Sequence, residues 1–371
     1  MKYPLVRPLL GDEERRAIDE VLASGHLVQG PKVRRFEREV AQIAGLAHGV
    51  ACSSGTAALH LALAAIDIAP TREVLVPAFG FPATANAVEL AGGRVRFVDV
   101  DPQTLCPTLQ TLEEATSEAT QGLLAVHPFG LPAPTDAYGA FCKSHSLWFL
   151  QDAACALGTD PDTGWADKRF PTCLSFHPRK TITTAEGGMV LTDDEELARK
   201  MRQLRNHGIE AEAPGWLRFE SAGFNYRLSD LAAALGLAQL GRLDEIVGKR
   251  RQLALWYREH LHAADHVEWL KAFDRDGLSI QSMIIRLPDE FDRDIVIREM
   301  LKEGVQTTLA GYAIDEQPFY QRRYGQDGRA YPHSSRLFRQ GLTLPLAHDM
   351  EEPDVEAVAK ALARATDQAR R

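Results

Sequence analysis

Hydrophobic positions along the chain follow two alternating patterns. Short apolar runs of strand length are separated by segments in which apolar residues recur every three to four positions, as in an amphipathic helix. The predicted strands are His48–Cys52, Glu73–Pro77, Val95–Val98, Leu123–Val126 and Leu147–Leu150, followed by 172–177 and 188–192. Helical patterns lie between them, for example over Ala57–Ile66 and Ala83–Leu90. Strands that alternate with helices predict βαβ units and an α/β fold with a mainly parallel, twisted sheet.

Two helices precede this series, and a second domain follows it. The first helix is predicted from Asp12, as N-cap, to about Ala23, and the second lies beyond a Gly-rich break at 25–31. From Ser229 the pattern predicts a long helix that bends near Gly248, an element that often links two domains. The remainder mixes a short strand with helices, at Ser282–Arg286, Asp294–Glu303 and Pro353–Arg364. We therefore predict a large domain over 1–248 and a smaller α+β domain over 249–371.

Composition narrows the function classes. The 371 residues suffice for two domains, and 45% hydrophobic with 25% charged residues is typical of a globular enzyme-sized protein. The net charge of -9 argues against a dedicated nucleic-acid surface. Five cysteines without a CxxC pair predict neither a disulfide framework nor a metal site. No signal peptide or membrane-spanning run is visible, so we expect a cytoplasmic protein without a membrane partner.

One lysine lies in an unusual place. Lys180 follows Ser175–Arg179 on a loop between two predicted buried strands. A lysine that is partly removed from water loses its proton more easily, and the neutral amine can form a Schiff base with an aldehyde cofactor. A solvated loop lysine is the alternative explanation.

Three further elements fall at the carboxyl ends of predicted strands, where ligands bind in an open α/β sheet. Ser53–Thr56 opens a helix, where backbone N–H groups and the helix dipole suit a phosphate, although simple N-capping would also explain it. Asp152 follows an apolar strand and must be paired or functional; it could cap a turn or hold a proton on a heterocyclic nitrogen. Phe79 and Phe81 could stack on a flat ring or pack in the core.

With these parts in place, the sequence resembles the DegT/DnrJ-type sugar aminotransferases, pyridoxal-phosphate (PLP) enzymes of fold type I. The similarity covers nearly the whole chain and includes a lysine motif with a Glu-Gly-Gly tail. The matching motifs are Ser24–Pro31, Ser53–Thr56, Gln151–Ala156, Ser175–Lys180, Thr183–Met189, Arg205–Gly208 and Gly223–Asp230. The resemblance implies a three-layer large domain and transfer of an amino group, by family habit from L-glutamate, to a nucleotide-linked ketosugar.

The resemblance also implies roles for individual residues. Lys180 would form the internal aldimine and Asp152 would pair with the pyridine nitrogen. Phe81 would stack on the ring, where relatives often have tryptophan. Asn225 would reach the phosphate of the neighbouring subunit's cofactor, which implies a homodimer with shared active sites. The remaining cofactor contacts implied by the family are Gly55, Thr56 and Ser175 at the phosphate and Cys155 near the ring.

Two departures from the family pattern concern the cofactor and the sugar. Cys155 stands where many relatives have glutamine or histidine, and a thiol is a weak hydrogen-bonding partner. Asp315 ends the stretch Tyr312–Asp315, where relatives often have a histidine. Two alternative functions stay open. A PLP-dependent sugar dehydratase would carry a histidine in place of Lys180, and a catalytically silent homologue would bind the cofactor without turnover.

Overall fold

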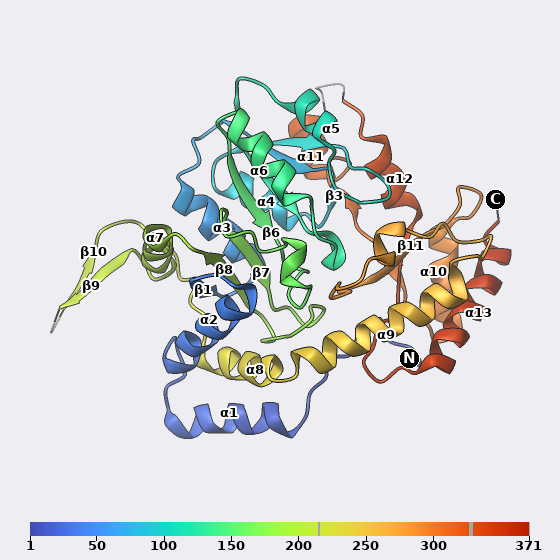
Figure 1. Cartoon of the computed structure of the whole chain (residues 1–371), viewed down its shortest axis with the longest axis horizontal. Coiled ribbons are helices and arrows are strands. Elements are labelled where there is room, and N and C mark those ends of the chain that lie inside the picture. Colours follow the sequence, from blue (N-terminus) through green and yellow to red (C-terminus); the bar gives the residue numbers. More distant parts are fainter. Residues whose placement is uncertain (214–215, 326–328, 371) are drawn as a thin grey trace.

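The computed structural model describes residues 1–213, 216–325 and 329–370. At its centre lies a seven-stranded sheet in the order β1-β8-β7-β6-β5-β2-β4 (Figure 1). Its strands are β1 (His48–Cys52), β2 (Glu73–Pro77), β4 (Arg94–Val98), β5 (Thr120–Val126), β6 (Trp148–Asp152), β7 (Thr172–Ser175) and β8 (Gly188–Thr192). Only β8 runs antiparallel to its neighbours in this sheet. The predicted mainly parallel sheet is therefore confirmed.

Helices cover both faces of this sheet. Successive strand residues point to opposite faces, so Val74 packs with one helical layer and Leu75 with the other. One layer consists of α3 (Gly55–Ile66), α4 (Ala83–Leu90) and α7 (Glu195–Arg205). The opposite layer contains α2 (Pro31–Ala44), α5 (Leu109–Ala115), α6 (Thr135–Ser144) and α8 (Asp230–Leu240). This arrangement confirms the three-layer architecture.

Two details of the helices differ from the sequence-based expectation. Helix α1 (Asp12–Ser24) is capped by Gly11, because the Glu14 carboxylate accepts a hydrogen bond from the Gly11 N–H at 2.6 Å. The predicted bend near Gly248 is wrong. The break lies at Gly241, between α8 and α9 (Leu243–Leu261), and Gly248 lies inside α9, where no neighbouring atom crowds it.

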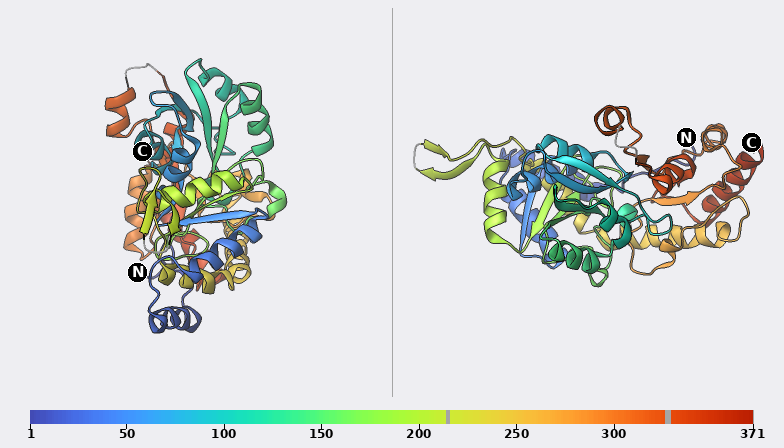
Figure 2. Two further views of the ribbon diagram at one scale, coloured as in Figure 1. Left: turned by 90° about the vertical axis from the view of Figure 1, so that its left-hand side faces the viewer. Right: turned by 90° about the horizontal axis from the view of Figure 1, so that it is seen from above.

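The C-terminal part forms a second layer of structure beside the large sheet (Figure 2). Strands β11 (Met283–Arg286), β14 (Gly341–Leu344) and β12 (Thr308–Leu309) make an antiparallel sheet. It packs against helices α10 (Arg293–Lys302) and α13 (Glu352–Gln368) in one core cluster, which also takes in Tyr3 from the N-terminus. The boundary proposed at residue 248 falls inside α9 and stays a prediction.

Several short elements complete the chain. Within the described ranges they are β3 (Phe79–Gly80), β13 (Tyr312–Ala313), α11 (Pro318–Tyr324) and α12 (Pro332–Gln340), together with three 3-10 turns. A hairpin of β9 (Ile209–Ala213) and β10 (Trp216–Phe219), which the sequence did not predict, projects away from the body (Figure 1). Across the described ranges, no helix combines the length and apolarity needed to cross a membrane.

Candidate active site

The carboxyl end of β7 meets the start of α3. Gly188 of β8 pairs with Cys52 on one side and with Ser175 on the other, so the ends of β1 and β7 flank it. Gly55, at the start of α3, approaches Ser175 so closely that a Cβ on Gly55 would lie 2.7 Å from the Ser175 Cβ. The structure thus brings Gly55, Thr56 and Ser175 to one place.

The chemistry of this place suits a phosphate. The Ser54 hydroxyl accepts a hydrogen bond from the Ala57 N–H at 3.1 Å, so Ser54 takes the capping role that the sequence left as an alternative. The first N–H groups of a helix have no partner within the helix, and they lie at the positive end of its dipole. Gly55 and Thr56 present such groups, with the Ser175 hydroxyl opposite.

Asp152 is the last residue of β6 and is buried, with 5% of its surface exposed. Its carboxylate accepts hydrogen bonds from the Thr84 hydroxyl at 2.6 Å and from the Ala154 N–H at 3.1 Å. Burial raises the pKa of Asp152, while these two donors and the Lys180 charge oppose the rise. A buried carboxylate with such an environment fits a cationic heterocyclic N–H. The sequence analysis did not identify Thr84 as a site residue, because no motif or spacing distinguishes it from other threonines.

Lys180 is half-buried, and its side chain faces the turn after β6. Its Nζ donates to the Cys155 Sγ at 3.1 Å. Its charge is near enough to Asp152 to oppose part of the rise that burial causes in the pKa of that carboxyl. The structure therefore brings Lys180, Cys155 and Asp152 together at one edge of the sheet, and the lysine is not a freely solvated loop residue.

Phe79 and Phe81 have different environments. Phe79 is buried in the core, whereas Phe81 is 70% exposed and free to meet a ring. Phe81 lies one turn before Thr84, whose N–H donates to the Phe81 carbonyl at 3.4 Å. The Phe81 ring stands edge-on to Tyr312, with 6.4 Å between centroids. Strand β13 pairs with β3, so this part of the C-terminal region is attached to the segment that carries Phe81.

Asn225 lies on the segment between β10 and α8. Its side chain is exposed, and its backbone forms a bridge with Asn206. The next residue, Tyr226, accepts a hydrogen bond from the Ser53 N–H at 2.9 Å, which fixes the segment beside the start of α3. The predicted contact of Asn225 with a neighbouring subunit stays a prediction.

Asp315, the second departure from the family pattern, is half-buried close to β13. Its Oδ1 is buried without a hydrogen-bond partner among the described residues. Burial, followed by the nearby Glu316 charge, raises the pKa of Asp315 to about 6. The carboxyl group is thus poised to change charge near neutral pH.

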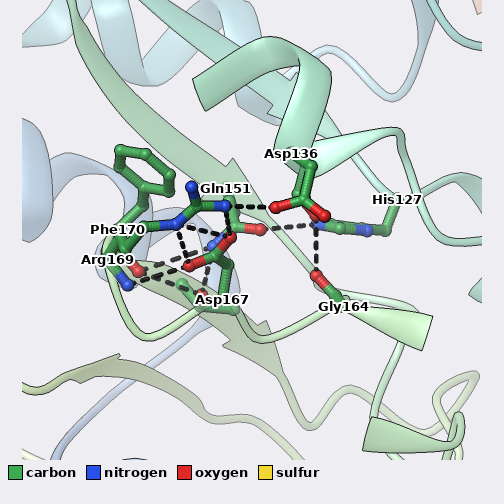
Figure 3. Close-up of polar contacts among 9 residues, drawn as sticks. His127, Asp136, Gln151, Gly164, Asp167, Arg169 and Phe170 are labelled. Carbon is green, nitrogen blue, oxygen red and sulfur yellow. Dashed lines mark hydrogen bonds and ion pairs between the residues drawn. The ribbon is translucent and has the colours of Figure 1, made fainter. Parts of the chain in front are cut away.

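His127 is attached to the strand that carries Asp152. It follows β5, and its backbone N–H donates a hydrogen bond to the Asp152 backbone carbonyl at 2.9 Å. The ring is fully buried; Nδ1 accepts from the Ala133 N–H at 3.1 Å, and Nε2 lies 3.3 Å from the Gln151 Oε1 (Figure 3). Burial lowers the pKa of His127 to about 4, so the ring is neutral at physiological pH. The sequence analysis did not single out His127, and it named Gln151 only as the first residue of a family motif.

The three-layer fold and the side chains at this edge define a class, the fold type I aminotransferases. Within that class, the chain belongs to the DegT/DnrJ/EryC1/StrS aminotransferase family, whose model matches residues 8–363. It is a member of a family of sugar aminotransferases.

Solved structures show the same similarity. Helicobacter pylori PseC, an aminotransferase of pseudoaminic acid biosynthesis, is 25% identical with a TM-score of 0.92, covering 99% of this chain and 100% of that one. DesI, solved with its TDP-sugar product, is 32% identical with a TM-score of 0.88, and the match covers 99% of this chain and 94% of DesI. Bacillus subtilis NtdA, solved with bound PMP, is 28% identical with a TM-score of 0.86, and the match covers 99% of this chain and 87% of NtdA.

Among the described residues there is no group of three or more His, Cys, Asp or Glu side chains arranged to hold a metal ion.

Proposed function

We propose that this chain is a PLP-dependent aminotransferase that converts a nucleotide-linked ketosugar into an aminosugar, with L-glutamate as amino donor. The observation that carries the proposal is the convergence of Lys180, buried Asp152 and the Gly55–Ser175 cradle at one edge of the sheet. The family, the sugar product bound to DesI and the PMP bound to NtdA support it.

Each residue has a defined task in this proposal. Gly55, Thr56 and Ser175 hold the cofactor phosphate, and Phe81 covers the ring. Asp152 keeps a proton on the ring nitrogen, and the bound cofactor then supplies an electron sink. Lys180 would hold the cofactor aldehyde covalently, and once the donor amine has displaced it, its free Nζ would take the proton from the donor α-carbon. It later returns a proton to the sugar carbon that receives the nitrogen. Donor and sugar use the site in turn, in a ping-pong order.

The test combines spectroscopy with single half-reactions. Purified protein with PLP should show an absorbance band that borohydride abolishes, with the label on the peptide that contains Lys180. Lys180→Ala should show neither the covalent label nor turnover. The amine form of the enzyme should then aminate one member of a panel of nucleotide ketosugars.

Other outcomes would point to the alternatives. Release of water from the sugar without consumption of glutamate would identify a dehydratase, although Lys180 counts against this reaction. Bound cofactor without any half-reaction would identify a silent homologue. A Lys180→Ala variant that behaves like wild type would refute the proposal as a whole.

The proposed assembly is a cytoplasmic homodimer in which Asn225 completes the partner's site. Its exposed side chain, fixed beside the start of α3, supports this arrangement. Mixing inactive Lys180→Ala with inactive Asn225→Ala subunits should restore activity, because one site of each mixed dimer keeps both residues. If the mixture stays inactive although mixed dimers form, Asn225 does not act across the interface.

A further inference from the structure

The buried segment 277–282, which leads into β11, touches three of the loops that build the site. Leu278, Ser279 and Ile280 are each no more than 3% exposed, yet the segment has no regular secondary structure. Backbone groups buried in this way need hydrogen-bond partners. The segment obtains them from the site loops and from α9.

The first contacts are with the turns after β5 and β6. The Ser279 hydroxyl donates to the Cys155 carbonyl at 3.1 Å, and the Ser279 N–H donates to the Thr159 hydroxyl at 3.0 Å. The Gln281 N–H donates to the Phe129 carbonyl at 2.9 Å. These bonds fasten the segment to the loops that follow His127 and Asp152.

The second contacts are with the lysine loop itself. The Gln281 side chain donates to the Arg179 carbonyl at 2.8 Å. Arg250, on α9, donates from Nη2 to the Lys180 carbonyl at 2.9 Å and from Nη1 to the Gln281 carbonyl at 2.9 Å. One guanidinium therefore joins the backbone of Lys180 to the segment that begins the small sheet.

Two features indicate that this connection is more than ordinary packing. Ile280 has a φ of 47°, an unfavourable value for a β-branched residue, and such strain persists only where the surroundings enforce it. Arg250 is 7% exposed, and burial lowers its pKa to about 10. A buried cation directed at backbone carbonyls is expensive to desolvate, which favours a positioning role over simple stabilisation.

We propose that Arg250 and Gln281 are positioning residues that hold the lysine loop and couple it to the 277–282 segment, so that a shift of the small sheet is transmitted to Lys180. The inference rests on the proposed function of Lys180. It concerns how the loop is held, and it can therefore be measured in the protein before cofactor is added.

Arg251 offers a matched control. It is the next residue of α9 and donates to carbonyls of the same segment, those of Leu278 at 2.7 Å and Gly277 at 3.0 Å. Its third acceptor is the Gly158 carbonyl, so within the described part of the chain its side-chain hydrogen bonds do not reach the lysine loop. Arg251→Met therefore removes a similar number of bonds from the segment without touching Lys180.

The experiment measures hydrogen exchange of the peptide spanning 178–184 in Arg250→Met, Arg250→Lys, Gln281→Leu and Arg251→Met. Loss of a charged hydrogen bond should speed local opening at least about tenfold. We expect this increase in the exchange rate in Arg250→Met and a smaller increase in Gln281→Leu. Arg250→Lys should exchange at a rate between those of Arg250→Met and wild type, and Arg251→Met should exchange at the wild-type rate. With PLP added, the pH midpoint of the cofactor absorbance band should shift in the first variant and not in the control.

Equal exchange of the lysine loop in Arg250→Met and Arg251→Met would overturn the inference. If Arg250→Met does not fold, Gln281→Leu carries the same comparison, and exchange equal to wild type in that variant would also overturn it. Failure of wild type to form a borohydride-sensitive band refutes the proposed function instead, and the exchange result in the cofactor-free protein stands separately.

Discussion

Acidification should destabilise this protein through His127. The imidazole is fully buried, and its Nδ1 accepts a hydrogen bond from the Ala133 N–H. The proton of the neutral ring therefore lies on Nε2, which donates to the Gln151 Oε1 at 3.3 Å. A protonated ring would lose the Ala133 contact and place a charge in the core, and burial accordingly lowers the pKa of His127 to about 4.

The size and sign of the effect follow from linkage. An unfolded histidine has a pKa of about 6.5, so between the two pKa values the unfolded chain binds more protons than the folded chain. The contribution of the neutral His127 ring to the free energy of unfolding is therefore complete above pH of about 6.5 and is lost as the pH falls toward 4. Between pH of about 7.5 and 5, His127 alone should lower the free energy of unfolding by roughly 2 kcal/mol.

The assay is urea unfolding at both pH values, at one protein concentration because association shifts apparent stability. His127→Asn removes the titrating group and keeps an acceptor for the Ala133 N–H. The variant should be less stable than wild type at pH 7.5, yet lose roughly 2 kcal/mol less on acidification. The exposed His333, replaced by Asn, is the control and should preserve the wild-type pH dependence.

Equal losses of stability in His127→Asn and wild type between the two pH values would refute this role of His127. That result would mean that the buried ring either stays neutral in the unfolded chain or accepts a proton in the folded one without penalty.

Three further substitutions test the site. Thr84→Val removes the hydroxyl donor to Asp152 and should weaken PLP binding by about tenfold or more, measured by fluorescence titration, whereas Thr84→Ser should bind nearly as wild type. Gly55→Ala places a Cβ 2.7 Å from that of Ser175 and should also weaken PLP binding, and the double variant with Ser175→Gly should recover thermal stability. Asp315→Asn removes a carboxyl group whose pKa burial raises to about 6, so that its ionised form destabilises the folded protein above that pH. The substitution should stabilise the protein at pH 7.5 by up to about 1 kcal/mol after solvent screening and have little effect at about pH 3, where the carboxyl is protonated in both states, as measured by urea unfolding.

The pattern of the sequence predicted the sheet well because its strands are buried on both faces and are bounded by turn residues. The ends of β1, β2 and β8 fall where the apolar runs end. The carboxyl-edge rule then predicted that Ser53–Thr56, Asp152 and the pair Phe79 and Phe81 lie at one edge, since strands that run parallel share one edge. Lys180 was singled out separately, by its place on a loop between two buried strands. The family resemblance added the cofactor and the individual roles.

Contacts between segments distant in the chain could not be predicted in the same way. Thr84 of α4 reaches Asp152 at the end of β6 through a hydrogen bond between segments far apart in the chain, and no local spacing encodes that meeting. The helix break at Gly241 was misplaced for a related reason. A glycine can lie inside a helix, as Gly236 does in α8 and Gly248 does in α9, so a glycine alone does not show where a helix ends.

The environment of Asp152 connects cofactor binding to stability. Burial disfavours its charged form, and the hydrogen bonds from Thr84 and Ala154 offset this only in part, since the pKa remains raised. A protonated heterocycle placed against the carboxylate would provide the missing charge and favour ionisation. The same contact that holds a proton on the ring would thereby relieve an unfavourable burial in the protein. Binding free energy and folding free energy at this position therefore have a common source, and a ligand specific to the folded state stabilises it by an amount that rises with the logarithm of its affinity.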